Sequence, residues 1–85
     1  MFYVYVLKSK KDDNLYIGFT PDIKKRLFKH NSGKVFSTKK RLPIKLIYTE
    51  ICLNKKDAIQ REKYLKTGVG KKFIKQRLKH YFNNN

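Results

Sequence analysis

Runs of apolar, β-branched and aromatic residues predict three strands. The first run, Phe2 to Leu7, is apolar or aromatic at every position, which is typical of a strand with both faces covered. Leu15 to Phe19 resumes this pattern after a polar, turn-rich stretch, so the two runs predict an antiparallel hairpin. Ile44 to Leu53 is a third run of the same kind. We therefore expect a small three-stranded antiparallel sheet.

A helix start follows the second predicted strand. Thr20 suits the N-cap, Pro21 the first helical position, and Asp22 adds an acid to the first turn. This helix should run to about Asn31, where a Ser-Gly pair offers a stop. Residues 34–43 are basic and weakly patterned, and they fit a loop or a short irregular helix equally well.

Two more helices are expected after the third strand. Asn54 can cap a helix that runs from Lys55 to about Thr67 and ends at two nearby glycines, Gly68 and Gly70. Residues 71–82 place apolar side chains at i, i+4, i+7 and i+8, which predicts an amphipathic helix. The expected order is β-β-α-β-α-α, an α+β fold in which helices flank the sheet.

Length and composition fit one folded domain. With 85 residues there is room for one modest core, and a hydrophobic content of 40% argues against disorder despite the heavy charge. No repeat or linker interrupts the pattern. We expect residues 1–82 to form a single domain and residues 83–85 a frayed tail.

The charge balance indicates a polyanionic partner. Lys and Arg total 22 against six acids, a formal net charge of +16, and such a chain attracts nucleic acid or an anionic membrane surface. The longest apolar run, Phe2 to Leu7, is too short to span a membrane, and no predicted helix has a wide apolar face with aromatics free to insert. The N-terminus lacks a signal-peptide pattern, and the lone Cys52 permits no intramolecular disulfide. A cytoplasmic, nucleic-acid-associated protein is expected.

Three polar residues fall on faces that should be buried. On the second predicted helix, Glu62 lies at about 40° from Ala58, inside the apolar face, where a carboxylate is costly unless it is paired or bound to a cation. Lys66, four residues on, is the ordinary partner. On the first helix His30 lies on the apolar face and Arg26 on its shoulder. A hydrogen-bonded core histidine and a solvated arginine would explain these two without any catalysis.

Taken together, these residues resemble the GIY-YIG nucleases. Tyr3-Val4-Tyr5 and, after a turn, Tyr16-Ile17-Gly18 are similar to the paired motifs that name the family, although Tyr3 stands where the family has glycine. Arg26 follows eight residues after the second motif, where the family has its helix arginine. His30 and Glu62 match the family's histidine or tyrosine and its metal-binding glutamate. The likeness covers nearly the whole chain and is closest to the small stand-alone members.

This resemblance implies a metal-dependent endonuclease that hydrolyses phosphodiester bonds. Glu62 would hold one Mg²⁺ or Mn²⁺ ion beside the scissile phosphate, and Arg26 would bind the non-bridging oxygens. Tyr16 would be the general base, while Tyr5 and His30 orient water or phosphate. His30 is the rival base, because imidazole titrates near neutral pH without help. The residues alone do not decide between Tyr16 and His30.

Two groups of basic residues are candidates for phosphate contacts. Both should bind the backbone without reading bases, so binding should weaken steeply with salt. A solvated helix face or loop is the simpler interpretation of either group. The residues are Lys34, Lys39, Lys40 and Arg41 in the first group and Lys66, Lys71, Lys72 and Lys75 in the second.

A non-catalytic nucleic-acid-binding module on the same fold is the alternative, because the net charge supports it equally. Glu62 separates the two hypotheses best, since a carboxylate facing phosphate repels it unless a metal ion lies between them. DNA is the expected partner, although the residues do not exclude RNA. Specificity could be intrinsic or supplied by a protein partner.

Overall fold

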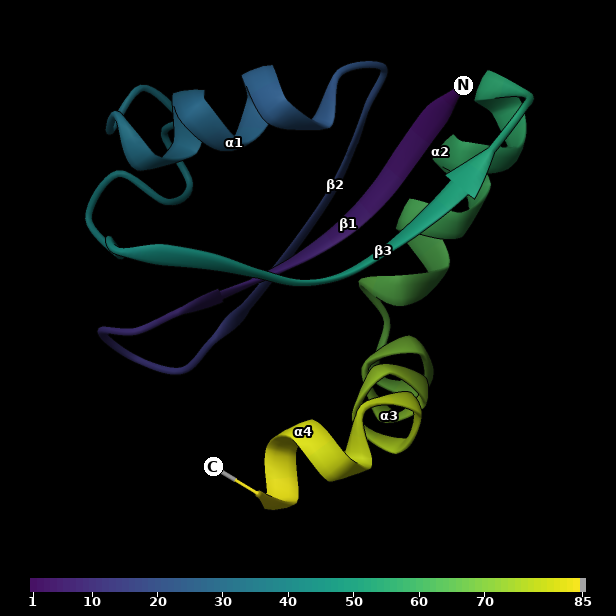
Figure 1. Ribbon diagram of the computed structural model, residues 1–85. Helices are drawn as coiled ribbons and strands as arrows, with labels where there is room; N and C mark the ends of the chain where they lie inside the picture. Colours follow the sequence, from purple (N-terminus) through teal and green to yellow (C-terminus); the bar gives the residue numbers. More distant parts are fainter. Residues whose placement is uncertain (85) are drawn as a thin grey trace.

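A central strand, flanked on both sides, organises the protein (Figure 1). The structure is a computed structural model that describes residues 1–84. Strand β1 (Phe2–Ser9) pairs antiparallel with β2 (Leu15–Thr20) and with β3 (Ile44–Cys52), which gives the sheet order β2-β1-β3. The predicted three-stranded antiparallel sheet is confirmed.

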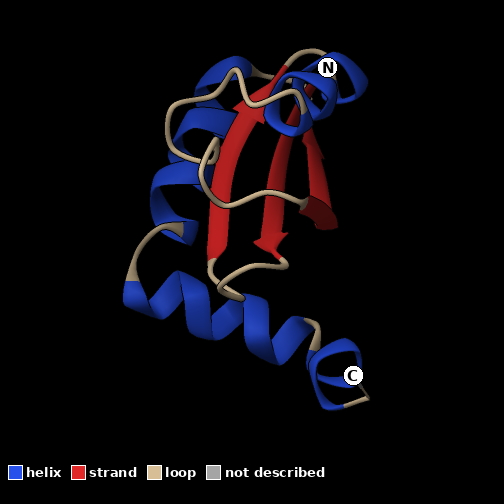
Figure 2. Ribbon diagram, turned by 90° about the vertical axis from the view of Figure 1, so that its left-hand side faces the viewer, coloured by secondary structure: helices blue, strands red, loops and turns tan. Residues whose placement is uncertain are grey.

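Helices cover both faces of this sheet. They are α1 (Ile23–Asn31), α2 (Lys55–Leu65), α3 (Gly68–Arg77) and α4 (Lys79–Asn83). Figure 2 shows α2 alongside the strands and the last two helices across one end of the sheet. None of the helices in residues 1–84 has the length and apolarity needed to cross a bilayer.

Alternate residues of β1 belong to two separate apolar clusters. Val4 and Val6, both fully buried, pack with Ala58, Leu65 and Ile74 from α2 and α3. The residues between and after them face the other way and pack toward α1; these are Tyr5 and Leu7, with Ile23, Leu27 and Ile44. Because successive side chains of a strand point to opposite faces, the continuous apolar run is explained by helices on both sides.

The start of α1 differs from the expected one. Asp22, not Thr20, is the N-cap, and its carboxylate accepts a hydrogen bond of 3.0 Å from the backbone N–H of Lys25. Thr20 is still in β2, where it pairs with Tyr3. The predicted cap was wrong because sheet pairing extends to Thr20, which leaves the next suitable side chain to begin the helix.

The two glycines after α2 begin a helix instead of ending one. α2 stops at Leu65, and Thr67 caps α3 by accepting a hydrogen bond of 3.0 Å from Gly70 N–H. The expected helix over residues 71–82 therefore starts earlier, at Gly68, and is divided at Leu78 into α3 and α4. The glycines predicted the end of a helix, but the side chain of Thr67 bonds the free N–H of Gly70 and so allows a new helix to begin there.

The basic segment between α1 and β3 is a series of turns. Ser9 Oγ donates to the carbonyl of Arg41 at 2.6 Å, and Lys10 N–H donates to the carbonyl of Pro43 at 2.9 Å. These bonds hold the segment against the β1–β2 hairpin. Of the expected tail, Asn83 belongs to α4 and Asn84 follows it, while residue 85 lies outside the described residues.

Candidate active site

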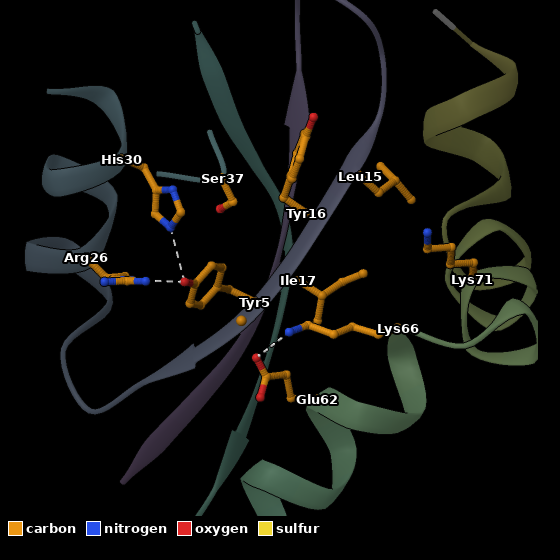
Figure 3. A pocket seen from close by; sticks show the side chains of 11 residues that line it. Tyr5, Leu15, Tyr16, Ile17, Arg26, His30, Ser37, Glu62, Lys66 and Lys71 are labelled. Atoms are coloured by element: carbon orange, nitrogen blue, oxygen red, sulfur yellow. Dashed lines mark hydrogen bonds and ion pairs between the residues drawn. The ribbon is translucent and has the colours of Figure 1, made fainter. Parts of the chain in front are cut away.

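One pocket gathers the five predicted site residues (Figure 3). It has a volume of about 320 Å³ and lies where β1 and β2 pass between α1 and α2. Tyr5 and Tyr16 come from the strands, Arg26 and His30 from α1, and Glu62 from α2. The pocket thus brings together residues up to 57 positions apart in the sequence. The remaining lining residues are Leu15, Ile17, Gly18, Ser37, Lys66 and Lys71.

The hydroxyl of Tyr5 is a junction between the two α1 residues. Arg26 donates its Nε–H to this oxygen at 3.1 Å, and His30 Nε2 lies 3.1 Å from it. Tyr5 is only 2% exposed. Gly18, its partner across the β1–β2 pair, makes room for it, since a Cβ atom there would collide with the Tyr5 hydroxyl. The glycine of the second motif therefore has a steric role in placing the tyrosine of the first.

His30 is enclosed and uses both ring nitrogens. Its Nδ1 lies 2.7 Å from the hydroxyl of Thr38, and the side chain is 3% exposed. Burial, and secondly the positive charge of Arg26, lower the pKa of His30 below its usual 6.5. The imidazole is therefore neutral at pH 7. Its Nε2 bonds Tyr5 and its Nδ1 bonds Thr38, so the imidazole affects the pocket by holding the Tyr5 hydroxyl in place.

Neutral His30 should make folding stability depend on pH. Because the pKa is lower in the folded chain, the unfolded chain binds the proton more readily, so the free energy of unfolding should fall as the pH drops below about 6.5. Urea denaturation between pH 7.5 and 5.5 measures this slope. His30→Gln should flatten it, whereas His80→Gln, at an exposed position on α4, should not. An equal slope in wild type and His30→Gln would contradict the assignment.

Tyr16 is the more accessible of the two tyrosines. It is half-buried, and its hydroxyl points away from that of Tyr5 (Figure 3). This hydroxyl donates a long hydrogen bond of 3.4 Å to Asp12. Asp12 also pairs with Arg41 at 3.0 Å. A hydrogen bond from the Asn14 backbone contributes most to lowering the pKa of Asp12, so this carboxylate is ionised. Its link to Tyr16 was not predicted.

Glu62 enters the pocket from the side opposite Arg26. Its side chain is 17% exposed and forms an ion pair of 3.1 Å with Lys66, so the ordinary partner expected from the spacing is present. Both residues nevertheless line the pocket. Within residues 1–84 no three histidine, cysteine, aspartate or glutamate side chains group as metal ligands. One carboxylate fits Mg²⁺ or Mn²⁺ only where water and substrate phosphate complete the ligand set, which is common for Mg²⁺.

The predicted phosphate-binding residues divide by their surroundings. Lys66 and Lys71 line the pocket itself. Arg41 is engaged by Asp12, so its charge is already partly neutralised. The other lysines have exposed side chains, either between α1 and β3 or on α3; they are Lys34, Lys39, Lys40, Lys72 and Lys75.

Thr38 and Ser37 were missed by the sequence analysis. Thr38 is fully buried and holds His30, while Ser37 lines the pocket. Both lie in the weakly patterned segment, where no periodicity marks a buried position. Because this segment is rich in lysine, nothing in its sequence distinguished the buried Thr38 from its exposed neighbours.

Comparison with known proteins gives the family. The model of the GIY-YIG catalytic domain matches residues 1–74. The chain belongs to the GIY-YIG family. A UPF0213 protein of Staphylococcus saprophyticus is 42% identical to it over 74 residues, covering 86% of this chain and 89% of the relative. A UPF0213 protein of Bacillus pumilus is 46% identical over 71 residues, covering 82% and 71%.

A solved structure agrees with the GIY-YIG fold described above. The solution NMR structure of a UPF0213 protein from Bacillus halodurans has a TM-score of 0.55 and 35% sequence identity, and the match covers 87% of this chain and 82% of the other. The predicted family and fold class are therefore confirmed. A GIY-YIG catalytic domain is the catalytic domain of a nuclease family whose members typically use a divalent metal.

Proposed function

We propose that the protein is a divalent-metal-dependent endonuclease that hydrolyses phosphodiester bonds of nucleic acid, with DNA as the expected substrate. The observation that carries this proposal is the Arg26–Tyr5–His30 hydrogen-bonded cluster facing Glu62 across one pocket. A pure binding protein needs positive charge, which the chain has in excess. It has no need of an enclosed tyrosine–histidine pair opposite a carboxylate.

Arg26 supplies the fixed positive charge. Its Nε–H is used by Tyr5, which leaves the other guanidinium N–H groups for the non-bridging oxygens of a phosphate. Because Tyr5 holds the guanidinium in place, little reorganisation is needed as charge develops in the transition state. Lys66 and Lys71 add charge on the other wall.

Glu62 would hold the metal ion, which when bound supplies a Lewis acid for the phosphate and its leaving oxygen. Lys66 pairs with this carboxylate in the free protein. When substrate arrives, Lys66 can turn to a phosphate, since its side chain is 54% exposed and flexible. The ion pair with Lys66 therefore balances the charge of Glu62 in the free protein and leaves the carboxylate available for a metal ion when substrate binds.

Tyr16 is the better candidate for the general base. Its side chain lines the pocket and is only half-buried, and its hydrogen bond to Asp12 is long, at 3.4 Å, so a water molecule can replace Asp12 as the partner of the hydroxyl. His30 has no ring nitrogen left for a water molecule, so its part is to fix the hydroxyl of Tyr5. The rival assignment of His30 as direct base is disfavoured by this geometry.

Cleavage assays test the proposal. Labelled duplex, nicked, branched and single-stranded DNA, and RNA, would be incubated with the protein in Mg²⁺, Mn²⁺ or EDTA. We expect metal-dependent cutting, and Arg26→Lys should slow it by about 100-fold, because a point charge cannot reproduce the planar fork that bridges Tyr5 and phosphate.

The matched control is Lys24→Ala, an exposed basic residue on the same helix outside the pocket. It should cut within about twofold of wild type. Tight, salt-sensitive binding with no cutting on any substrate would contradict the proposal and leave a binding module that uses the same basic surface.

A further inference from the structure

Phe36 is an aromatic side chain held in solvent. It is 86% exposed, more than any other large apolar side chain in residues 1–84. It lies in the turns between α1 and β3, in a segment held to the hairpin by hydrogen bonds from Ser9 Oγ and Lys10 N–H. Leaving a phenyl ring in water loses the stabilisation that burial would give it, so a ligand that covers the ring gains from the contact.

The surroundings of Phe36 are cationic. Lys39 Nζ lies 5.0 Å from the centroid of the ring. A second hollow beside the ring is lined by Phe36, Ser37, Lys39, Lys40 and Arg41. Ser37 also lines the active-site pocket, so the two hollows adjoin. A chain bound at one of them can continue into the other.

This combination of groups suits one kind of ligand. Lys39 lies over the Phe36 ring, but the side chain is 86% exposed, so ring surface remains on which a nucleobase can stack while nearby lysines contact the phosphates on either side. An apolar protein surface docked on the ring would leave these cations without partners, which is costly. In a duplex the faces of the bases are already stacked on their neighbours, so only an unpaired base offers a face to the ring.

We propose that Phe36 stacks on an unpaired nucleotide of the substrate, with Lys39 and Lys40 on its phosphates, so that the strand entering the active-site pocket is single-stranded at this point. The inference deepens the proposed nuclease function by naming the substrate class, and its cleavage aspect rests on that function. The same chemistry is offered by single-stranded DNA and single-stranded RNA.

Equilibrium binding in EDTA tests the stacking site without requiring cleavage. Fluorescence anisotropy would compare a labelled 12-nucleotide DNA strand, the matching RNA strand and the blunt DNA duplex. Phe36→Ala should weaken single-strand binding about 5- to 150-fold, the range for stacking one base on one aromatic. Duplex binding should change less than about twofold. The slope of affinity against salt should stay the same, because no charge is removed.

Two variants separate stacking from mere exposure. Phe36→Trp should retain single-strand binding and quench 2-aminopurine placed in the strand. Phe28→Ala removes another exposed phenylalanine, 69% exposed on α1, and should leave binding unchanged. A Phe36 effect on DNA alone, RNA alone or both supports the site and names its ligand.

Wild-type single-strand affinity in Phe36→Ala, or equal weakening for strand and duplex, overturns the stacking proposal. These outcomes are independent of catalysis. A protein that binds through Phe36 and cuts nothing overturns the nuclease alone, whereas cutting that ignores Phe36 overturns the stacking site alone.

Discussion

Glu62→Gln should lower the cleavage rate by at least about 1,000-fold while leaving the fold and the binding of nucleic acid intact. The amide keeps the size and shape of the carboxylate but removes the charge that would hold a divalent cation, and the metal's share of transition-state stabilisation is several kcal/mol. Single-turnover cleavage in Mg²⁺ and in Mn²⁺ measures the loss. Affinity in EDTA should be equal or higher, since the substitution removes one negative charge from the pocket in which we propose that phosphate binds.

Asp57→Asn is the matched control for this substitution. Asp57 is also an acid on α2, but it is exposed in the first turn and does not line the active-site pocket. Its replacement should cost only a few tenths of a kcal/mol of helix stability and leave cleavage unchanged. If Glu62→Gln cut as fast as Asp57→Asn, Glu62 would be a structural partner of Lys66 and nothing more.

Gly70→Ala should lower the free energy of unfolding by about 3 kcal/mol. An added Cβ would lie 2.5 Å from the Cα of Leu65 and closer still to the carbonyl oxygen of Tyr64. These are backbone atoms, which cannot turn aside as a side chain can. A domain of this size has about 4–13 kcal/mol in total, so the loss is a large fraction. Urea denaturation followed by circular dichroism measures it.

Gly68→Ala provides the comparison within the same helix. An added Cβ there meets nothing within 4 Å, so the substitution should stabilise the protein by about 0.5 kcal/mol through the lower flexibility of the unfolded chain. Opposite signs at two glycines two positions apart would show that close packing, not helix propensity, decides the effect. Equal small effects would contradict the packing seen at Gly70.

The helices and strands with a clear apolar pattern were predictable, and the helix ends and connecting segments were not. The three strands followed from apolar runs, and the α1, α2 and α3 regions followed from capping residues and apolar spacing, because each element buries apolar side chains against the rest of the fold. The predicted helix ends at Thr20 and Gly68 were wrong. Several neighbouring residues there can bond the same free backbone groups, and contacts with the rest of the fold decide which of them does so. The turns over residues 34–43 were left open for the same reason.

The candidate site was predictable in its residue types and only partly in its contacts. Charge and spacing singled out His30 and Glu62, which are polar on an apolar face, and Arg26 at the edge of one. Nothing local indicated that His30 bonds Thr38 or that Tyr16 reaches Asp12. Such pairs join a patterned element to an unpatterned one, and their partners become visible only when the chain is folded.

Apolar core residues and the tyrosine of the pocket alternate along β1. Val4 and Val6 belong to the apolar interior shared with α2 and α3, while Tyr5 between them carries the junction of the pocket. A slip of β1 by a single position against its neighbours would send valines to the pocket and the tyrosine into the interior. Such a slip would separate the Tyr5 hydroxyl from Arg26 and His30 while leaving the amount of strand in the protein almost unchanged.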